Sequence, residues 1–227
     1  MVQYFLNNGG YFMKKMLLVG LMLSCFVFAA DKSYYVIDTF EDGNMTDAPQ
    51  WWTFGDSKQD IVNTSLYSNS PLKKYLGNKA LQVKGETKAW YIGGIGAYLG
   101  IDADKYTHLK VYVYGNGPKS GKVTLQMYDD DNFNYKLEQD IENNYEPIFD
   151  DKFEYTVNVI WKGWKVLIIP INKFKDVNKT VGDNIWNPDN KKGSGGLLHY
   201  QMIFLASSKT GPINVAVDNL KLITIAN

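Results

Sequence analysis

The chain has 227 residues, and its 24 basic and 24 acidic side chains give a formal net charge of zero. Neutrality argues against a nucleic-acid partner, because cation–phosphate contacts supply most of that affinity, and the chain contains no arginine, the usual bidentate ligand of phosphate and guanine. The one cysteine is Cys25, near the N-terminus, so the rest of the sequence excludes a disulfide, a thiolate nucleophile and a cysteine-based metal site.

Residues 1–30 are predicted to be a signal peptide. Lys14 and Lys15 form a positive start, residues 16–28 form an apolar run, and residues 27–29 fit the small-x-small rule for cleavage. The apolar run is shorter than the roughly 20 residues that a membrane-spanning helix needs. We therefore expect no stable membrane span in the mature chain and a secreted or periplasmic location in a bacterium.

The signal fits best from Met13 onwards, so residues 1–12 are interpreted as an over-called start. Leu23 and Ser24 before Cys25 weakly resemble a lipoprotein cleavage box. The apolar residues that follow Cys25 argue against lipidation, because a lipid-modified N-terminus is usually followed by polar residues.

Residues 31–227 are predicted to form one all-β domain, an antiparallel β-sandwich of the jelly-roll type. Short runs with apolar residues at every second position alternate with turn sequences rich in Gly, Asn, Asp and Ser, and no run beyond the signal shows a helical period. The predicted strands lie near residues 34–40, 51–54, 80–84, 90–98, 109–114, 122–128, 134–138, 154–160, 165–169, 200–205 and 213–223.

Acidic residues follow the first predicted strand and recur in the last. Calcium takes about six to eight oxygen ligands, including backbone carbonyls from turns. Glu41 and Asp218 are therefore candidate ligands of a structural Ca²⁺ between the terminal strands, although no EF-hand spacing is present. A second acidic run, at residues 129–132, is either a solvated turn or a set of acceptors for ligand hydroxyls.

Two aromatic pairs flank predicted loops. They are Trp51 with Trp52 and Trp90 with Tyr91. An exposed member of either pair would be a binding subsite, but the sequence does not say which of the four is exposed.

Residues 108–131 contain two strictly alternating runs around a loop rich in Gly, Pro and Ser, which predicts a hairpin. One face of the two runs is apolar. The other face carries Tyr112, Tyr114, Gln126 and Tyr128, and a period of two makes this division rigid. A solvated face does not need three tyrosines and an amide.

Two later strands offer polar groups on their non-core face in the same way. A sugar ring presents an apolar C–H face to aromatic rings and a rim of hydroxyls to amides, carboxylates and imidazole. If the strands are neighbours, their faces merge into one glycan platform; the alternative is that tyrosine, a good strand former, merely decorates half-exposed sheets. The candidate ligand-binding residues are Tyr112, Tyr114, Gln126, Tyr128, Asp129, Glu154, Asn158, His199 and Gln201.

No catalytic residue is predicted. Glycoside hydrolysis needs two carboxylates at a set separation, and no motif isolates such a pair. The two histidines, His108 and His199, lie far apart, and no nucleophile elbow or phosphate-binding loop is present. We expect a protein that is not an enzyme.

Several segments carry a resemblance to a known family. They are FEDG at 40–43, KALQV at 79–83, DKYTHLKVYVYG at 104–115, VTLQMYDDD at 123–131, WKGWKVLIIPINKF at 161–174 and VDNLKLI at 217–223. In this order they resemble the galactose-binding-like jelly roll of non-catalytic carbohydrate-binding modules. The resemblance is strongest to the family 11 modules of β-glucanases and to CIA30-type domains.

The resemblance spans nearly the whole of residues 31–227, and it implies a sugar held on the concave sheet. The residues it implicates are Tyr112, Tyr128, Asp129, His199 and Gln201. The absence of arginine, which some of these grooves use, is a departure from the pattern.

The function expected from the sequence is secreted, non-catalytic binding of a polysaccharide, either a β-glucan or a cell-surface glycan. One alternative is a structural or filament-sheath envelope protein that uses the same sandwich for protein contacts, because spirochaete flagellar sheath proteins have a similar late pattern. A glycosidase or lyase is a distant third. The expected partners are a polysaccharide or envelope proteins, with no nucleic acid.

Overall fold

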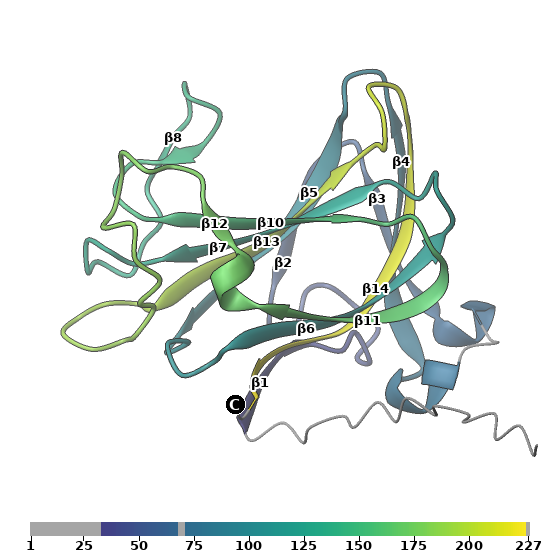
Figure 1. Ribbon diagram of the computed structural model, residues 1–227, viewed down its shortest axis with the longest axis horizontal. Coiled ribbons are helices and arrows are strands. Elements are labelled where there is room, and N and C mark those ends of the chain that lie inside the picture. The colour runs from purple at the N-terminus through teal and green to yellow at the C-terminus, as the bar shows by residue number, and fades with distance from the viewer. Residues whose placement is uncertain (1–32, 68–70, 226–227) are drawn as a thin grey trace, which may run out of the picture.

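The alternating strands form two antiparallel sheets that pack face to face, which confirms the predicted all-β sandwich (Figure 1). The computed structural model describes residues 33–67 and 71–225. The predicted signal peptide and Cys25 lie outside these residues. Within the described ranges, no helix has the length and apolar character to span a membrane.

The first sheet, called the β6 sheet below, has the strand order β11-β6-β14-β4-β3, and β1 pairs with β14. Its strands are β1 (Ser33–Asp38), β3 (Lys58–Asn63), β4 (Lys79–Thr87), β6 (His108–Asn116), β11 (Lys162–Pro170) and β14 (Gly211–Thr224).

The second sheet, called the β7 sheet, has the order β12-β10-β7-β13-β5-β2. Its strands are β2 (Trp51–Gly55), β5 (Tyr91–Ile101), β7 (Lys122–Asp129), β10 (Lys152–Asn158), β12 (Lys175–Asp176) and β13 (Leu197–Leu205). A small hairpin of β8 (Gln139–Asp140) and β9 (Glu146–Pro147) stands at one end of the molecule. The 3₁₀ helices are η1 (Thr64–Tyr67), η2 (Pro71–Tyr75) and η3 (Ile171–Lys173).

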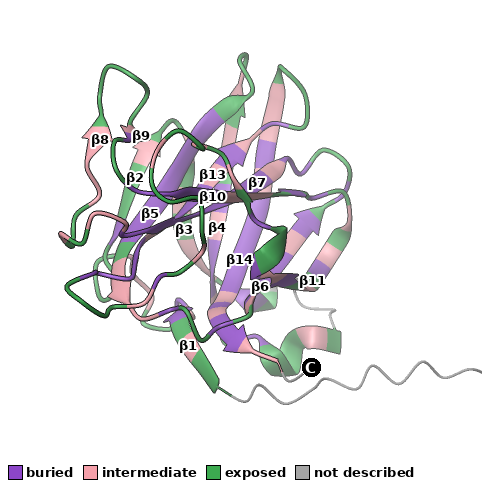
Figure 2. Cartoon of the chain, turned by 60° about the vertical axis from the view of Figure 1, so that its left-hand side comes forward, coloured by how far each residue is buried: buried purple, intermediate pink, exposed green. Residues whose placement is uncertain are grey.

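The main core lies between the two sheets. The apolar faces of β6 and β7 both point into it, and buried residues run along β5, β7, β13 and β14 in Figure 2. The core residues that the alternation of residues 108–131 predicted are Leu109, Val111, Val113, Val123, Leu125 and Met127, and all are buried.

The predicted hairpin of β6 with β7 is wrong, because the two strands belong to opposite sheets. The two strands face each other across the core, and each turns its apolar side inward. Their sequences therefore show the same alternation of apolar and polar residues as the two strands of a hairpin. The connecting loop crosses the end of the sandwich. Gly121, with φ +101°, permits the crossing, since a Cβ there would lie 2.4 Å from Ile213 Cδ1 and 2.7 Å from the carbonyl oxygen of Leu205.

One further strand prediction is wrong, and one edge strand was missed. Residues 134–138 form a loop that precedes β8, and the edge strand β3 was not predicted. The sequence of β3, KQDIVN, is mostly polar and half-exposed, so it lacks the apolar face that identifies a strand.

A second, smaller core covers the outer face of the β6 sheet. Tyr112, Trp164 and Ala216 are buried there with Leu76 and Ala80, and Leu72, Tyr114 and Val166 pack against them. Leu72 belongs to η2, so the segment that contains this 3₁₀ helix lies over the sheet. The tyrosines of β6 are therefore packing residues on the opposite sheet from Tyr128, and the prediction that all three share one face is wrong.

Candidate functional site

The outer face of the β7 sheet brings together five of the predicted ligand-binding residues. Gln126 on β7 pairs with Glu154 on β10 and with Gln201 on β13, while Tyr128 pairs with His199. The three strands are thus neighbours, as the merged platform required. Asn158 shares this face but pairs with Lys122 at the far end of β7, away from the others.

These polar side chains form a hydrogen-bonded network. The side-chain amide of Gln126 donates to the carboxylate of Glu154, and the Tyr128 hydroxyl donates to the Gln126 carbonyl oxygen at 3.0 Å and lies 3.5 Å from that of Gln201. Burial, followed by the charges of Glu154 and Glu146, raises the pKa of Tyr128, so its hydroxyl remains a donor. The amides are held in fixed orientations before any ligand arrives.

Two aromatic rings lie on a glycine-rich stretch of β5 beside this network. Trp52 and Phe54 on β2 pair with Gly96 and Gly94. A Cβ at Gly96 would lie 2.4 Å from Trp52 Cζ2, and one at Gly94 would lie 2.3 Å from Phe54 Cζ. The rings occupy the space that side chains on β5 would fill, so they lie close against the sheet.

The structure answers which of the tryptophans on β2 is exposed. Trp51 is buried in the main core and donates its indole N–H to Asp38 at 2.7 Å, whereas Trp52 is 37% exposed on the outer face. Trp90 and Tyr91 are exposed as well. The sequence signal for the seating of Trp52 and Phe54 is the run of glycines at 93, 94 and 96, which leaves space above β5 for aromatic rings.

The imidazole of His199 is fixed by aromatic rings around it. Its centroid lies 5.1 Å from that of Trp52, 5.7 Å from Tyr98 and 6.2 Å from Tyr128, each in an edge-to-face arrangement. Burial lowers the pKa of His199 to about 4, so the ring is neutral at physiological pH. The neutral imidazole packs between the rings of Trp52 and Tyr128.

A cavity of about 490 Å³ lies between this face and the β8–β9 hairpin. The sheet contributes Phe54, Tyr91, Gln126, Tyr128, Gln201 and Ile203, and the hairpin contributes Gln139, Ile141, Asn144, Tyr145 and Glu146. An ion pair between Lys152 and Glu146 ties the hairpin to β10. A second, more open hollow of about 530 Å³ adjoins Trp52 and Tyr98 and is bounded by residues 48–51.

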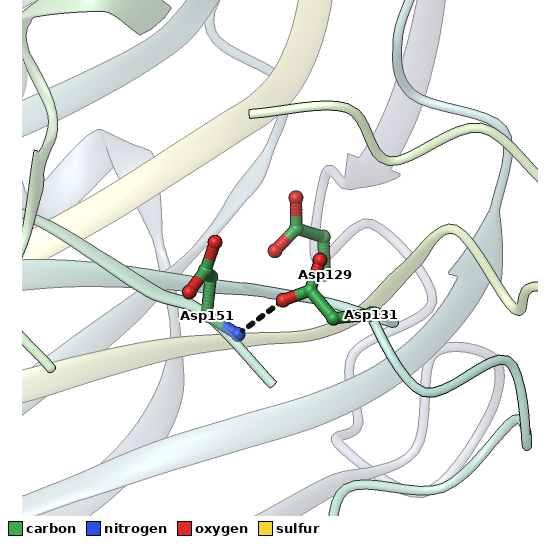
Figure 3. A group of neighbouring side chains, drawn as sticks. All are labelled: Asp129, Asp131 and Asp151. Atoms are coloured by element: carbon green, nitrogen blue, oxygen red, sulfur yellow. Dashed lines mark hydrogen bonds between the residues drawn. The ribbon is translucent and has the colours of Figure 1, made fainter. Parts of the chain in front are cut away.

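Asp129 does not belong to this face. The alternation of β7 sends it to the inner side, where it is 1% exposed and lies with Asp131 and Asp151 (Figure 3). The prediction that Asp129 binds ligand on the glycan platform is therefore wrong, because its side chain does not reach that face. The aspartates form a separate group at the end of the sheet.

The candidate calcium ligands lie near one another, as the prediction required. The Glu41 carboxylate accepts the backbone N–H of Asn78 at 3.0 Å and of Lys79 at 2.8 Å. Asp218 is fully buried, and neither of its oxygens has a partner that meets hydrogen-bond geometry. Burial first, and then the charges of Glu41 and Asp38, raise the pKa of Asp218 to about 7. The backbone N–H groups of Asn219 and Gly77 act in the opposite direction and lower the pKa of Asp218. Calcium at Glu41 and Asp218 stays a prediction.

The comparisons with known proteins concern the fold. No family model and no curated protein sequence matches this chain. Among the solved structures that are similar to this chain are two of family 11 carbohydrate-binding modules from Clostridium thermocellum. One is the module of the cellulosomal cellulase Lic26A-Cel5E, with a TM-score of 0.52, 16% identity, and coverage of 86% of this chain and 95% of that one.

The other is a family 11 module in complex with a β-1,3-1,4-mixed-linked tetrasaccharide, with a TM-score of 0.53, 16% identity, and coverage of 86% and 97%. The predicted resemblance to the β-sandwich of carbohydrate-binding modules is confirmed at the level of the fold.

Proposed function

We propose that this chain binds a polysaccharide, without cleaving it, on the outer face of the β7 sheet. The observation that carries the proposal is the juxtaposition of two aromatic rings seated on Gly94 and Gly96 with an oriented network of amide, hydroxyl and carboxylate groups. The rings match the apolar face of a sugar ring, and the network matches its hydroxyls.

A mixed-linked β-glucan is the first ligand to test. The solved family 11 module with this sandwich is in complex with a β-1,3-1,4-mixed-linked tetrasaccharide. The two hollows beside Phe54 and Trp52 open along the same sheet face, which suits an extended chain better than a single sugar.

Cleavage is not part of the proposal, because Glu146 in the cavity wall and Glu154 next to Gln126 each already have a partner. Glu146 is paired with Lys152, and Glu154 accepts a hydrogen bond from Gln126. A glycosidase needs one carboxyl free to donate a proton and a second one across the scissile bond. With these contacts, neither carboxylate is the free proton donor that the reaction needs.

We also propose that residues 1–30 export the chain, which places the binding face outside the cytoplasm of a bacterium. The ligand would then be a secreted or cell-surface glycan.

A protein partner is the second candidate, and exposed apolar side chains around the β8–β9 hairpin favour it. Phe133, Ile141, Tyr145 and Phe149 are all exposed. A protein that packed there would cover the cavity as well. Size-exclusion chromatography of the chain over a range of concentrations separates self-association from a monomeric binding module.

Retention on immobilised mixed-linked β-glucan, together with a glycan array, tests the proposed function. Trp52→Ala should reduce the affinity by about 2 kcal/mol, roughly thirtyfold, as expected for a central aromatic anchor. Tyr34→Ala is the matched control, because Tyr34 is an exposed aromatic, at 58%, on the other sheet. Failure of the wild-type chain to bind any glycan on the array would reject carbohydrate binding and favour the protein partner.

A further inference from the structure

Three aspartates meet at the end of the β7 sheet, away from the glycan face. Asp129 ends β7, Asp131 follows it in the loop, and Asp151 immediately precedes β10. The pairing of Tyr128 with Lys152 brings the end of β7 beside the start of β10. One carboxylate oxygen from each aspartate lies within 4.8 Å of the other two, and Figure 3 shows the three side chains gathered around one space.

Backbone amides orient each carboxylate through one oxygen. Asp131 Oδ2 accepts the N–H of Asp151 at 2.8 Å, Asp151 Oδ2 accepts that of Ile185 at 3.2 Å, and Asp129 Oδ2 accepts that of Asn187 at 3.2 Å. The remaining oxygens of two of them have no partner. Asp129 is 1% exposed and Asp151 is 0% exposed, yet Oδ1 of each has no hydrogen bond.

The charges that act on this cluster are other carboxylates. After burial, the charges of Asp131, Asp151 and Asp183 raise the pKa of Asp129. The charges of Asp131, Asp176 and Asp183 raise that of Asp151 in the same way. Burial, with this repulsion added, raises the pKa of Asp131 to about 6 and that of Asp151 to about 7. Among the described residues, the lysine ion pairs involve Glu146 and Asp189 and not this cluster.

The loop before β13 closes over the carboxylates at Gly182. This residue has φ +65°, and a Cβ there would lie 2.1 Å from Asp151 Oδ1 and 2.4 Å from Asp131 Oδ2. Only a glycine lets the backbone approach so near to the carboxylates. The loop also supplies the backbone N–H groups of Ile185 and Asn187 that orient Asp151 and Asp129.

We propose that Asp129, Asp131 and Asp151 form a binding site for a divalent cation, Ca²⁺, that ties the loop around Gly182 to the ends of β7 and β10. The site is separate from Glu41 and Asp218, which lie on the β1 and β14 side of the molecule. A cation bound here satisfies the two buried oxygens and removes the repulsion among the carboxylates. The proposal does not depend on glycan binding.

Calcium titration of the metal-free full chain by calorimetry, with terbium luminescence as a second readout, tests the proposal. Trp186 lies between Ile185 and Asn187, the residues whose amides orient Asp151 and Asp129, so it should sensitise terbium bound at the site. We expect wild-type protein to give terbium emission that calcium displaces. Asp131→Asn and Asp151→Asn should weaken terbium and calcium binding at this site by at least tenfold, whereas Asp218→Asn should leave the part of the emission that Trp186→Phe removes unchanged.

The variants Trp186→Phe and Asp131→Asn keep the test decisive if Asp151→Asn does not fold. Trp186→Phe should lose the emission and keep calcium binding. Asp131→Asn, at a half-buried position, should melt at the same or a higher temperature than wild type in chelator, because it removes repulsion, and should gain less from added calcium. The absence of terbium emission from wild type, or wild-type calcium affinity in Asp131→Asn, would overturn the proposal.

Discussion

The outer faces of the two sheets carry similar residues and use them differently. On the β6 sheet, Tyr112 and Trp164 are buried beneath the segment that contains η2, in a second small core. On the β7 sheet, Trp52 remains 37% exposed, and the β8–β9 hairpin leaves a cavity over the neighbouring polar network. Pointing away from the main core is therefore not the same as facing solvent, because another segment of the chain can cover the outer side of a sheet.

The polar groups differ between the faces as well. Gln126 and Tyr128 of the hydrogen-bonded network lie in the wall of a cavity, whereas the cluster around Tyr112 packs aromatic and aliphatic side chains together. Packing of the second kind stabilises the fold. Oriented donors and acceptors beside open space suit a ligand.

The largest expected effect is the loss of stability when Tyr112 is truncated to alanine. This variant tests the comparison, because an open binding surface on the β6 sheet would tolerate the truncation. Tyr112 is 4% exposed, so Tyr112→Ala should lower the free energy of unfolding by roughly 3–5 kcal/mol, as for an aromatic removed from a core. Trp52→Ala should cost far less. Urea unfolding of both variants measures the difference, and similar losses would mean that both faces are packed.

Calcium should stabilise the end of the sandwich where the terminal strands meet. If Glu41 and Asp218 bind the ion, calcium at 100 times its dissociation constant should raise the free energy of unfolding by about 2.7 kcal/mol. Asp218→Asn should lose this contribution and keep any gain from the cluster of Asp129, Asp131 and Asp151, whereas Asp131→Asn should keep this contribution and lose the gain from the cluster. A melting temperature of metal-free Asp218→Asn that responds to calcium as wild type does would remove these two residues as ligands.

His199 should make stability fall on acidification. The folded chain keeps the imidazole neutral down to about pH 4, whereas the unfolded chain takes up a proton near the ordinary value of 6.5. The contribution of His199 to the free energy of unfolding is therefore fully present above pH 6.5. It is lost as the pH falls from 6.5 towards 4, by on the order of 1–3 kcal/mol. His199→Gln should remove that part of the decline. Urea unfolding at several pH values in this window compares the two slopes, and equal slopes would mean that His199 is not the group responsible.

The hydroxyl of Tyr128 should contribute least. Tyr128→Phe leaves the carbonyl oxygens of Gln126 and Gln201 without this donor, at a cost of about 1 kcal/mol in stability. Tyr98→Phe, at a half-exposed position on the same face, is the control. If the two variants have equal unfolding free energies, the network is not held by the Tyr128 hydroxyl.

The sequence predicts the site within each strand and not between strands. Alternation put Gln126, Tyr128, Glu154, His199 and Gln201 on the outer side, and the register shows that their strands are neighbours. For Tyr112 and Tyr114, alternation gave the wrong sheet, because a strand in either sheet must turn its apolar face to the same core. Nothing in the period of two says which sheet a strand joins.

The features that the sequence did not predict depend on contacts between segments that lie far apart in the chain. The floor under Trp52 depends on Gly96 of β5, and the aspartate cluster needs Asp151 beside Asp129, more than twenty residues away. The covering of Tyr112 depends on where residues 71–76 fold back. Such meetings are set by the packing of the whole domain, so a single strand does not reveal them.

An NMR titration with a mixed-linked β-glucan oligosaccharide tests the central claim most directly, because it reports which sheet face meets the ligand. The account predicts chemical-shift changes at the indole N–H of Trp52, at the backbone amides of Gly94 and Gly96 and at the side-chain amides of Gln126 and Gln201. The indole N–H of Trp164 and the amides of β6 and β11 should stay unchanged. Changes centred on Trp164 and β6 would contradict the assignment of the site to the β7 sheet.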